Sequence, residues 1–410
     1  MKILLFTEEY PPHGSGVASS AKRIGQGLAA TGQDVMILTY DRLPIDGLDP
    51  RTEITKDGDV QLLQVGPYMR FPKRTKGPKL DDSTRAILRR RFIESAEWKL
   101  RQVDFIPDLI ISLYLTDAGY LSCFLASRFD CPHIAGVRGN DIGLNLFDPP
   151  KMSLTSYVLE RADAIAYVNS FLYDLGTSQF PATKSRSFVT NNSIAPVIDI
   201  SPHPRRSLEM LAGWDSHHRI FAYVGLFREK KGCIEIIDAF HRLTESEPDH
   251  PARLLLVSPP LSKLENETIG ERLNALIQSG RAKQISNVPR EEVLRHISGS
   301  DFLLMPSRSD GMANALLEGM VCGLCPVVSE VFTDLIEHGK NGIMLDGVSS
   351  SDLINAINLG CEDDFDAKLL GSRARASVAR RSPKDEAEEY LSIYRGITAG
   401  TEKREVRAMS

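Results

Sequence analysis

Cysteine is scarce in this sequence, with six residues among 410. Small disulfide-stapled proteins are far richer in cysteine, so the composition excludes a disulfide scaffold and favours a reduced, cytoplasmic setting. Long apolar runs are absent as well, and none approaches the ~20 residues that a membrane helix needs. At the N-terminus only Ile3 to Phe6 separate Lys2 from a polar stretch. That run is too short for the apolar core of a signal peptide, and it predicts a buried first strand.

Neither sign of charge dominates the chain, whose formal net charge is −5. The absence of a basic excess argues against a general nucleic-acid binder. The hydrophobic content of 42% and the charged content of 25% are ordinary for a globular protein. A chain of 410 residues is too long for one ordinary core, so we expect two domains.

The first 40 residues have the pattern of a parallel α/β unit. An apolar strand at Lys2 to Phe6 is followed by a loop with Gly14, Ser15 and Gly16, and then by helical spacing from Ala18 to Thr31. Gly32 stands where a helix C-cap belongs, and Val35 to Thr39 form the next strand. A continuous apolar strand that leads through a glycine-bearing loop into a helix is typical of parallel sheets.

The same pattern restarts in the second half of the chain. Periodicity stops around 195–204, where three prolines gather, and resumes with a strand at Ile220 to Val224 and a helix at Ile234 to Leu243. We therefore predict an α/β protein of two Rossmann-like doubly wound domains that face each other across a cleft. The predicted boundaries are 1–198 for the first Rossmann-like domain, 199–383 for the second, and 384–410 for a C-terminal helix and tail that pack back on the first domain.

The most informative stretch runs from 306 to 328. An apolar strand, Phe302 to Met305, ends at Pro306, and Asp310 then precedes a helix that contains Glu318. A turn of this kind directs unpaired backbone N–H groups beyond the strand end, which is a ready site for an anion. With a carboxylate on either side, the turn suits a phosphorylated ligand that also carries hydroxyls, such as a nucleotide-sugar.

A second anion site is predicted between Gly225 and Gly232. This loop also follows a strand and opens a helix, and it contains Arg228 and Lys231. Glycines let the backbone approach a phosphate, and the two cations can neutralise it.

Together the two loops resemble the donor half of a family 4 glycosyltransferase of the GT-B fold. The family pattern is roughly Gly-Arg-x5-Lys-Gly followed by Glu-Gly-Phe-Gly-x4-Glu; Lys231-Gly232 match the first part, and Asp310-Gly311 with Glu318 match the second. The resemblance extends to the 14–16 loop, to the Arg138-Gly139-Asn140-Asp141 loop and to 162–164, so it spans nearly the whole chain.

The resemblance implies a role for each matching residue. Lys231 would contact the donor diphosphate, Asp310 would hold hydroxyls of the donor sugar, and Glu318 would accept hydrogen bonds from the ribose. Amides near the start of the helix would stabilise the leaving diphosphate. The remaining predicted donor contacts are Gly14, Ser15, Gly16, Arg138, Gly225, Arg228, Asn287, Val288, Gly311, Met312, Ala313, Asn314, Ala315 and Leu316.

The chain departs from the family pattern at several positions. Leu226 replaces the family arginine, and Arg228, two residues further on, is the candidate substitute. Asp310 stands in place of a glutamate, Arg138 in place of a frequent histidine, and 257–260 lack the expected glycine loop. We assign the catalytic role to Arg228, Lys231 and Asp310, and we expect the shorter acid to influence which sugar is accepted.

The activity implied by the resemblance is transfer of a sugar from a nucleoside-diphosphate sugar to an unknown hydroxyl acceptor, with retention of anomeric configuration. No metal or other cofactor is expected, and the diphosphate itself would help to take the acceptor proton. The alternative is a nucleotide-sugar epimerase or a non-catalytic sugar-nucleotide binder of the same fold.

Three further signals have competing interpretations. Asp57-Gly58-Asp59 has the form of a metal-binding Asp-x-Asp, but Asp-Gly here favours a hairpin turn. Cys322 and Cys325 have redox-motif spacing, yet they follow a helix, which favours two packed thiols. The segment 70–101 holds eleven Lys or Arg against four Asp or Glu. It is either a solvated helix and loop or a peripheral contact with the inner face of an anionic membrane.

Overall fold

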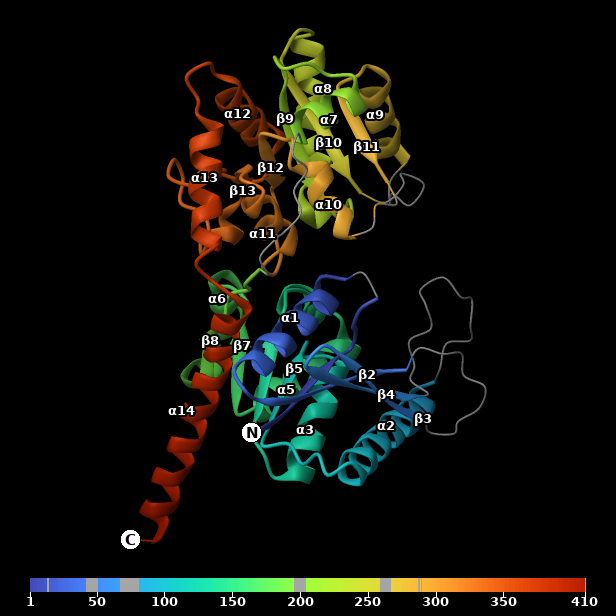
Figure 1. Cartoon of the computed structure of the whole chain (residues 1–410), viewed down its shortest axis with the longest axis vertical. Coiled ribbons are helices and arrows are strands. Elements are labelled where there is room, and N and C mark those ends of the chain that lie inside the picture. The colour runs from blue at the N-terminus through green and yellow to red at the C-terminus, as the bar shows by residue number, and fades with distance from the viewer. Residues whose placement is uncertain are drawn as a thin grey trace. The chain divides into compact units, whose positions relative to one another are not determined.

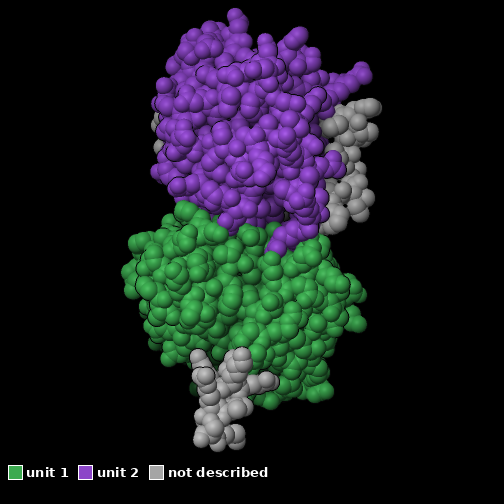
Figure 2. Space-filling model, turned by 90° about the vertical axis from the view of Figure 1, so that its left-hand side faces the viewer, with its two compact units in different colours: residues 1–192, 382–410 green, residues 193–381 purple. Residues whose placement is uncertain are grey.

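The computed structural model of the chain describes residues 1–12, 15–41, 51–66, 81–194, 204–258, 267–286, 288 and 290–409. The chain divides into two compact units, which Figure 2 shows in different colours. The first unit comprises Met1–Asn192 and Ser382–Ser410, and the second comprises Ser193–Arg381. The divisions lie at 192/193 and 381/382, where we predicted 198/199 and 383/384. At the later division Ser382 and Asp385 cap the last helix, so the final segment begins with this cap.

The first unit contains an eight-stranded sheet in the order β3-β4-β2-β1-β5-β6-β7-β8 (Figure 1). All neighbouring strands in it are parallel except β3 and β4, which form an antiparallel hairpin. The strands are β1 Lys2–Thr7, β2 Asp34–Tyr40, β3 Arg51–Asp57, β4 Val60–Gly66, β5 Leu109–Leu113, β6 His133–Val137, β7 Ala164–Tyr167 and β8 Ser187–Val189. The helices are α1 Gly16–Ala30, α2 Asp82–Gln102, α3 Asp117–Phe129, α4 Asn140–Gly143, α5 Pro149–Arg161, α6 Ser170–Gln179 and α14 Pro383–Met409, with 3-10 turns η1 Asn145–Phe147 and η2 Pro181–Arg186.

Helices cover both faces of this sheet because successive residues of β1 are apolar and point to opposite sides. Ile3 and Leu5 pack in a cluster with residues of α1 and α14. Leu4 and Phe6 pack in a second cluster with residues of α2 and α3. The unit is therefore doubly wound, with the C-terminal helix forming part of one layer (Figure 1).

The second unit contains a six-stranded parallel sheet in the order β11-β10-β9-β12-β13-β14. Its strands are β9 Arg219–Val224, β10 Ala252–Val257, β11 Ala282–Ile285, β12 Phe302–Met305, β13 Cys325–Val328 and β14 Ile343–Met344. Its helices are α7 Pro204–Ala212, α8 Cys233–Ser246, α9 Glu267–Gln278, α10 Arg290–Ile297, α11 Asn314–Val321, α12 Ser350–Cys361 and α13 Ala367–Val378, with 3-10 turns η3 Glu229–Lys231 and η5 Glu330–Phe332.

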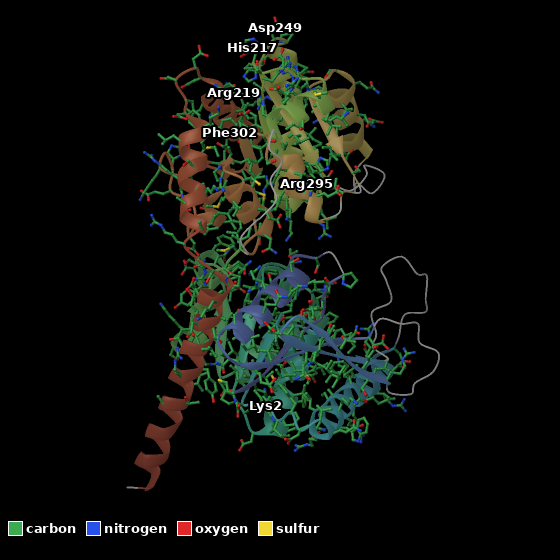
Figure 3. All side chains as sticks on the ribbon, viewed as in Figure 1. Lys2, His217, Arg219, Asp249, Arg295 and Phe302 are labelled. Atoms are coloured by element: carbon green, nitrogen blue, oxygen red, sulfur yellow. The ribbon has the colours of Figure 1, made fainter. Side chains whose placement is uncertain are left out.

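Two adjacent residues of β12 illustrate how this second sheet is covered on both faces. Phe302 stacks on Phe221 with ring centroids 4.3 Å apart, in a core that includes residues of α8 and α12. Leu303 faces the other side, where Gly319 of α11 lies so close that an added Cβ would stand 2.5 Å from the leucine side chain. Arg219 and Phe302 mark the N-terminal ends of the two central strands (Figure 3). The opposite, C-terminal ends carry the loops in which we predicted the site.

Candidate donor site

The loop after β9 is shaped by two glycines with positive φ. Gly225 has a φ of 121° directly after the strand, and Gly232 has a φ of 72° where it caps α8. Between them Leu226 is 49% exposed, while its carbonyl accepts a hydrogen bond from the Tyr223 hydroxyl at 2.7 Å. The predicted glycine-bearing turn is present, and its last residues form the 3-10 turn η3.

The loop after β12 packs directly on this first loop. Gly232 lies against Pro306, and a Cβ added to the glycine would stand 2.3 Å from the Pro306 carbonyl oxygen. The Arg308 backbone N–H donates to the Lys230 carbonyl oxygen at 3.0 Å. Two segments that are far apart in the sequence therefore form one surface at the C-terminal edge of the sheet.

This packing brings Lys231 and Asp310 together. Lys231 Nζ lies 3.3 Å from Asp310 Oδ2, and the two side chains are 20% and 15% exposed. The other carboxylate oxygen of Asp310 accepts the Gly311 backbone N–H at 2.9 Å, which fixes the orientation of the acid. The structure thus pairs two of the three residues to which we assigned a catalytic role.

Positive charge is concentrated around Asp310. Burial lowers the pKa of Lys230. The nearby Asp310 carboxylate opposes this shift, and the positive charges of Lys231 and Arg228 add to it. Arg228 has extended backbone immediately before η3 and is partly buried. Three cations close to one carboxylate leave a surplus of positive charge, which is suited to a diphosphate.

The start of α11 supplies further donors. Its N-cap is Ala313, which has no polar side chain and makes no side-chain cap to the first turn. Helix amides that no side chain caps carry the partial positive charge of the helix dipole. Met312 and Leu316 are buried and anchor the turn, whereas Ala315 and Glu318 are only partly buried.

The other predicted donor contacts are placed as follows. Ser15 caps α1 by accepting the Ala18 N–H at 3.1 Å, and Gly16 is the first residue of that helix. Both belong to the first unit, and Val288 belongs to the second, where it is partly buried outside helices and strands. Gly14 and Asn287 lie outside the described residues.

Arg138 follows β6 in the first unit and is held by a buried carboxylate. Asp141 accepts the Arg138 backbone N–H at 2.8 Å and the Leu115 N–H at 2.9 Å, which ties together the ends of β6 and β5. Burial raises the pKa of Asp141 to about 7, against the effect of these hydrogen bonds. The Arg138 side chain itself is 8% exposed and donates from Nη2 to Asn192 Oδ1 at 2.7 Å.

Two features of the second unit were missed by our sequence analysis. Lys230 joins the cationic group, and Arg308 Nη2 donates to Glu235 Oε1 at 2.7 Å, linking the β12 loop to the first turn of α8. The sequence does contain a signal for Arg308, because this cation stands two residues before Asp310 in a loop that follows a strand.

The Asp57-Gly58-Asp59 segment and the cysteine pair have the structures that we predicted, a turn and two packed thiols. Asp57 pairs with Val60 across the β3–β4 hairpin, and Gly58 has a φ of 61°, so this segment is a turn. Cys322 and Cys325 are free thiols, and burial raises the pKa of each to about 12. Within the described residues, no group of three or more His, Cys, Asp or Glu is placed to hold a metal ion.

Comparison with known proteins shows what the chain is similar to. A family model described as "Glycosyl transferases group 1" matches residues 218–363, which include both loops of the site. The match lies within the second unit. The chain is also similar to the D-inositol 3-phosphate glycosyltransferase of Corynebacterium urealyticum, with 26% identity over 390 residues, covering 90% of this chain and 88% of that protein.

Solved structures support the fold. The chain superposes on a sucrose-phosphate synthase from Thermosynechococcus elongatus with a TM-score of 0.74 at 16% identity, covering 98% and 100% of the two chains. It superposes on Anabaena Alr3699/HepE, solved in complex with UDP, with a TM-score of 0.69 at 14% identity, covering 96% and 99%. The two parallel-sheet domains and the GT-B fold that the sequence predicted are thus confirmed.

Proposed function

We propose that this glycosyltransferase moves a hexosyl group from a nucleoside-diphosphate sugar to an acceptor hydroxyl, with retention of anomeric configuration and without a metal ion. The observation that carries the proposal is the Lys231–Asp310 pair, 3.3 Å apart, beside the start of α11. A cation, a carboxylate and helix amides at one strand edge match the needs of a donor that carries a diphosphate and a sugar. The UDP bound in the Anabaena structure supports a nucleotide donor.

Leaving-group stabilisation is the main catalytic task that we assign to this site. As the bond between sugar and diphosphate breaks, negative charge grows on the departing phosphate oxygens. Lys231, Arg228 and the first amides of α11 would each stabilise that charge, and removal of one such contact typically costs ~10²–10³ in rate. The cationic group supplies positive charge of the kind that a metal ion provides in other transferases, so we expect turnover to persist in EDTA.

Asp310 would position the donor sugar by accepting hydrogen bonds from its hydroxyls. Its Oδ1 is held by the Gly311 amide and its Oδ2 by Lys231, so the acid is fixed before the sugar arrives. In this account Glu318 selects the ribose, and Gly14 to Gly16 with Arg138 contact the donor from the first unit. The retained configuration follows from attack on the face that the diphosphate leaves, with a diphosphate oxygen accepting the acceptor proton.

For the acceptor we propose a hydroxyl compound bound by the first unit. The relative named for D-inositol 3-phosphate supports a small phosphorylated polyol as the first class to try. We keep the cytoplasm as the expected compartment, and all six cysteines are free thiols. No helix in the described part of the chain combines the length and the apolar character that spanning a membrane requires.

Membrane contact by the basic segment stays a prediction. In the described part of this segment several cations are paired with carboxylates, which weakens the expected attraction to lipid. On α2, Arg89 pairs with Asp117 at 2.7 Å, Arg90 with Glu94 at 2.8 Å, and Arg101 with Glu97 at 3.0 Å. Paired cations attract an anionic lipid surface less than free ones do. Residues 70–80 of this segment lie outside the described residues.

The test is a transfer assay with the full chain. The purified protein is mixed with UDP-, GDP-, ADP- and TDP-sugars and a panel of polyol phosphates, and NMR follows donor consumption and the anomeric configuration of the product. We expect one donor to be consumed, with product of the donor's configuration. The rate should fall roughly 10²–10³-fold in Lys231→Ala.

Lys340→Ala is the matched control, because Lys340 is a 66% exposed lysine of the same unit and pairs with Glu337. Its turnover should equal that of the wild type. Tight donor binding with no turnover would favour the non-catalytic binder, and conversion of the donor into its epimer would favour the epimerase. Product of inverted configuration would contradict the proposed mechanism.

A further inference from the structure

The Arg308 side chain ties together three segments of the second unit. Its Nη2 atom donates to Glu235 Oε1 at 2.7 Å and to the Val348 carbonyl oxygen at 3.0 Å. Arg308 lies in the loop after β12, Glu235 in the first turn of α8, and Val348 between β14 and α12. One guanidinium group therefore links segments that are distant in the sequence.

The backbone of Arg308 is anchored to the same region of the unit. Its N–H donates to the Lys230 carbonyl oxygen at 3.0 Å, whereas its side chain reaches Glu235. Residues 230 and 235 stand on either side of Gly232, where the chain passes from the 3-10 turn η3 into α8. The two contacts thus hold the β12 loop across the whole of this turn.

Glu235 is an unusual partner for an exposed arginine. Its side chain is only 13% exposed, and its Oε2 atom is buried and accepts no hydrogen bond within the described residues. A buried oxygen left without a donor costs free energy. The Arg308 side chain is 47% exposed, and ion pairs with one exposed partner usually add little to stability. Stability alone therefore does not explain this arrangement, and we looked for a role in the adjacent site.

The pair connects the two segments that carry the donor-site charges. Asp310 follows Arg308 by two residues, and Lys231 stands between Lys230 and Gly232. The position of the acid relative to the lysine, with Nζ and Oδ2 3.3 Å apart, depends on how the two segments are held. Misplacement of a reacting group by about 1 Å can cost about 10²-fold in rate.

We infer that Arg308 and Glu235 are a positioning pair, which holds Asp310 where it meets the hydroxyls of the donor sugar. The pair acts through Asp310 and does not itself contact the ligand. This inference rests on the proposed function and deepens it, because it assigns the preference for a sugar-bearing donor over the bare nucleoside diphosphate to this link. Lys231 keeps its place through η3 and the contact of Gly232 with Pro306, so binding of the diphosphate does not require the pair.

The experiment compares two affinities by isothermal titration to the full chain. The probes are UDP, GDP, ADP and TDP, and the sugar conjugates UDP-glucose, UDP-N-acetylglucosamine, GDP-mannose, ADP-glucose and TDP-glucose. Arg308→Met keeps a long side chain but removes both hydrogen bonds of the guanidinium. We expect it to bind the preferred conjugate roughly tenfold or more weakly than the wild type, and the matching diphosphate within about twofold.

Two conservative variants separate positioning from folding. Arg308→Lys can still form an ion pair with Glu235, so it should bind both ligands within about threefold of the wild type. Glu235→Gln keeps an oxygen acceptor but loses the charge, and it should weaken the conjugate by roughly three- to tenfold. If Arg308→Met does not fold, Glu235→Gln decides the question.

Arg272→Met is the matched control. Arg272 is a 48% exposed arginine of the same unit, and it pairs with Asp238 on the same helix, α8. It should bind every probe as the wild type does.

Unchanged affinity for the conjugate in Arg308→Met and Glu235→Gln would overturn the inference and leave the proposed function intact. An equal loss for conjugate and diphosphate would also overturn it, because the pair would then support the whole site rather than the acid. If the wild type binds no diphosphate and no conjugate, the proposed function fails and the inference fails with it.

Discussion

At the scale of single residues, the two units use buried charge differently. In the second unit the Lys231 Nζ and Asp310 Oδ2 atoms lie 3.3 Å apart, so a cation and a carboxylate face each other at the strand edge. In the first unit Asp141 is fully enclosed, and its carboxylate serves the backbone rather than a cation. The pKa of about 7 that burial gives Asp141 makes this residue sensitive to pH.

Asp141 should make the stability of the first unit depend on pH. Its pKa rises from the ordinary 3.8 in the unfolded chain to about 7 in the folded one, so the folded state holds the extra proton between these values. Stability is therefore favoured at low pH and falls as pH rises from about 4 to about 7. Asp141→Asn cannot titrate and should lack this fall, although it starts less stable because its amide nitrogen cannot accept an N–H.

The check is the apparent Tm of both proteins at pH 5 and pH 8. The wild type should lose more stability than Asp141→Asn over this interval. Identical pH profiles for the two proteins would show that Asp141 does not carry the shift.

At the scale of elements, the donor site depends on how two loops meet. Gly232 combines a left-handed backbone, φ 72°, with contact against Pro306, and no larger residue satisfies both conditions. The hydrogen bond from the Arg308 backbone N–H to the Lys230 carbonyl oxygen also holds the two loops together. The geometry of the Lys231–Asp310 pair follows from this contact.

Gly232→Ala should therefore separate the two loops. We expect it to destabilise the protein more than Gly280→Ala, which has nearly the same φ of 73° but nothing within 4 Å of the added Cβ. Gly280→Ala should cost only the backbone strain, ~1–2 kcal/mol. Chemical unfolding of both variants measures the difference, and equal destabilisation would mean that the Pro306 contact is unimportant.

Elements were predictable where the local sequence determines them. The strands β1, β9 and β12 are continuous apolar runs, as buried parallel strands are, and glycines mark the turns that follow β1 and β9. Helix α14 extends to Met409, through most of the segment in which we predicted a helix followed by a tail. The contact of Gly232 with Pro306 joins distant segments, which no local pattern encodes.

At the scale of the whole molecule, the chain returns to its first unit after completing the second. Helix α14 packs with α1, and Gly27 of α1 lies so close that an added Cβ would stand 2.2 Å from the Pro383 carbonyl oxygen. The Arg23–Glu386 pair joins the same two helices, with side chains 10% and 0% exposed. The C-terminal segment is therefore part of the first core.

Glu386→Ala should destabilise the protein by ~3–5 kcal/mol, because it removes the carboxylate that faces the buried Arg23 guanidinium. The control is Glu388→Ala on the same helix, whose 46% exposed carboxylate pairs with Arg395 at 3.4 Å and should contribute less than ~1 kcal/mol. The double variant Arg23→Met/Glu386→Leu should recover much of the loss. Urea unfolding measures all three variants, and a neutral Glu386→Ala would show that the pair does not hold α14 in place.

The central claim is that the loops after β9 and β12 of the second unit bind the diphosphate of a nucleotide-sugar. It is tested most directly by isothermal titration of UDP, GDP, ADP and TDP into the wild type, Lys231→Ala and Lys340→Ala. We predict that at least one diphosphate binds the wild type and Lys340→Ala equally, and binds Lys231→Ala roughly tenfold or more weakly. Equal affinity for the wild type and Lys231→Ala, or no binding of any diphosphate to the wild type, would contradict the account.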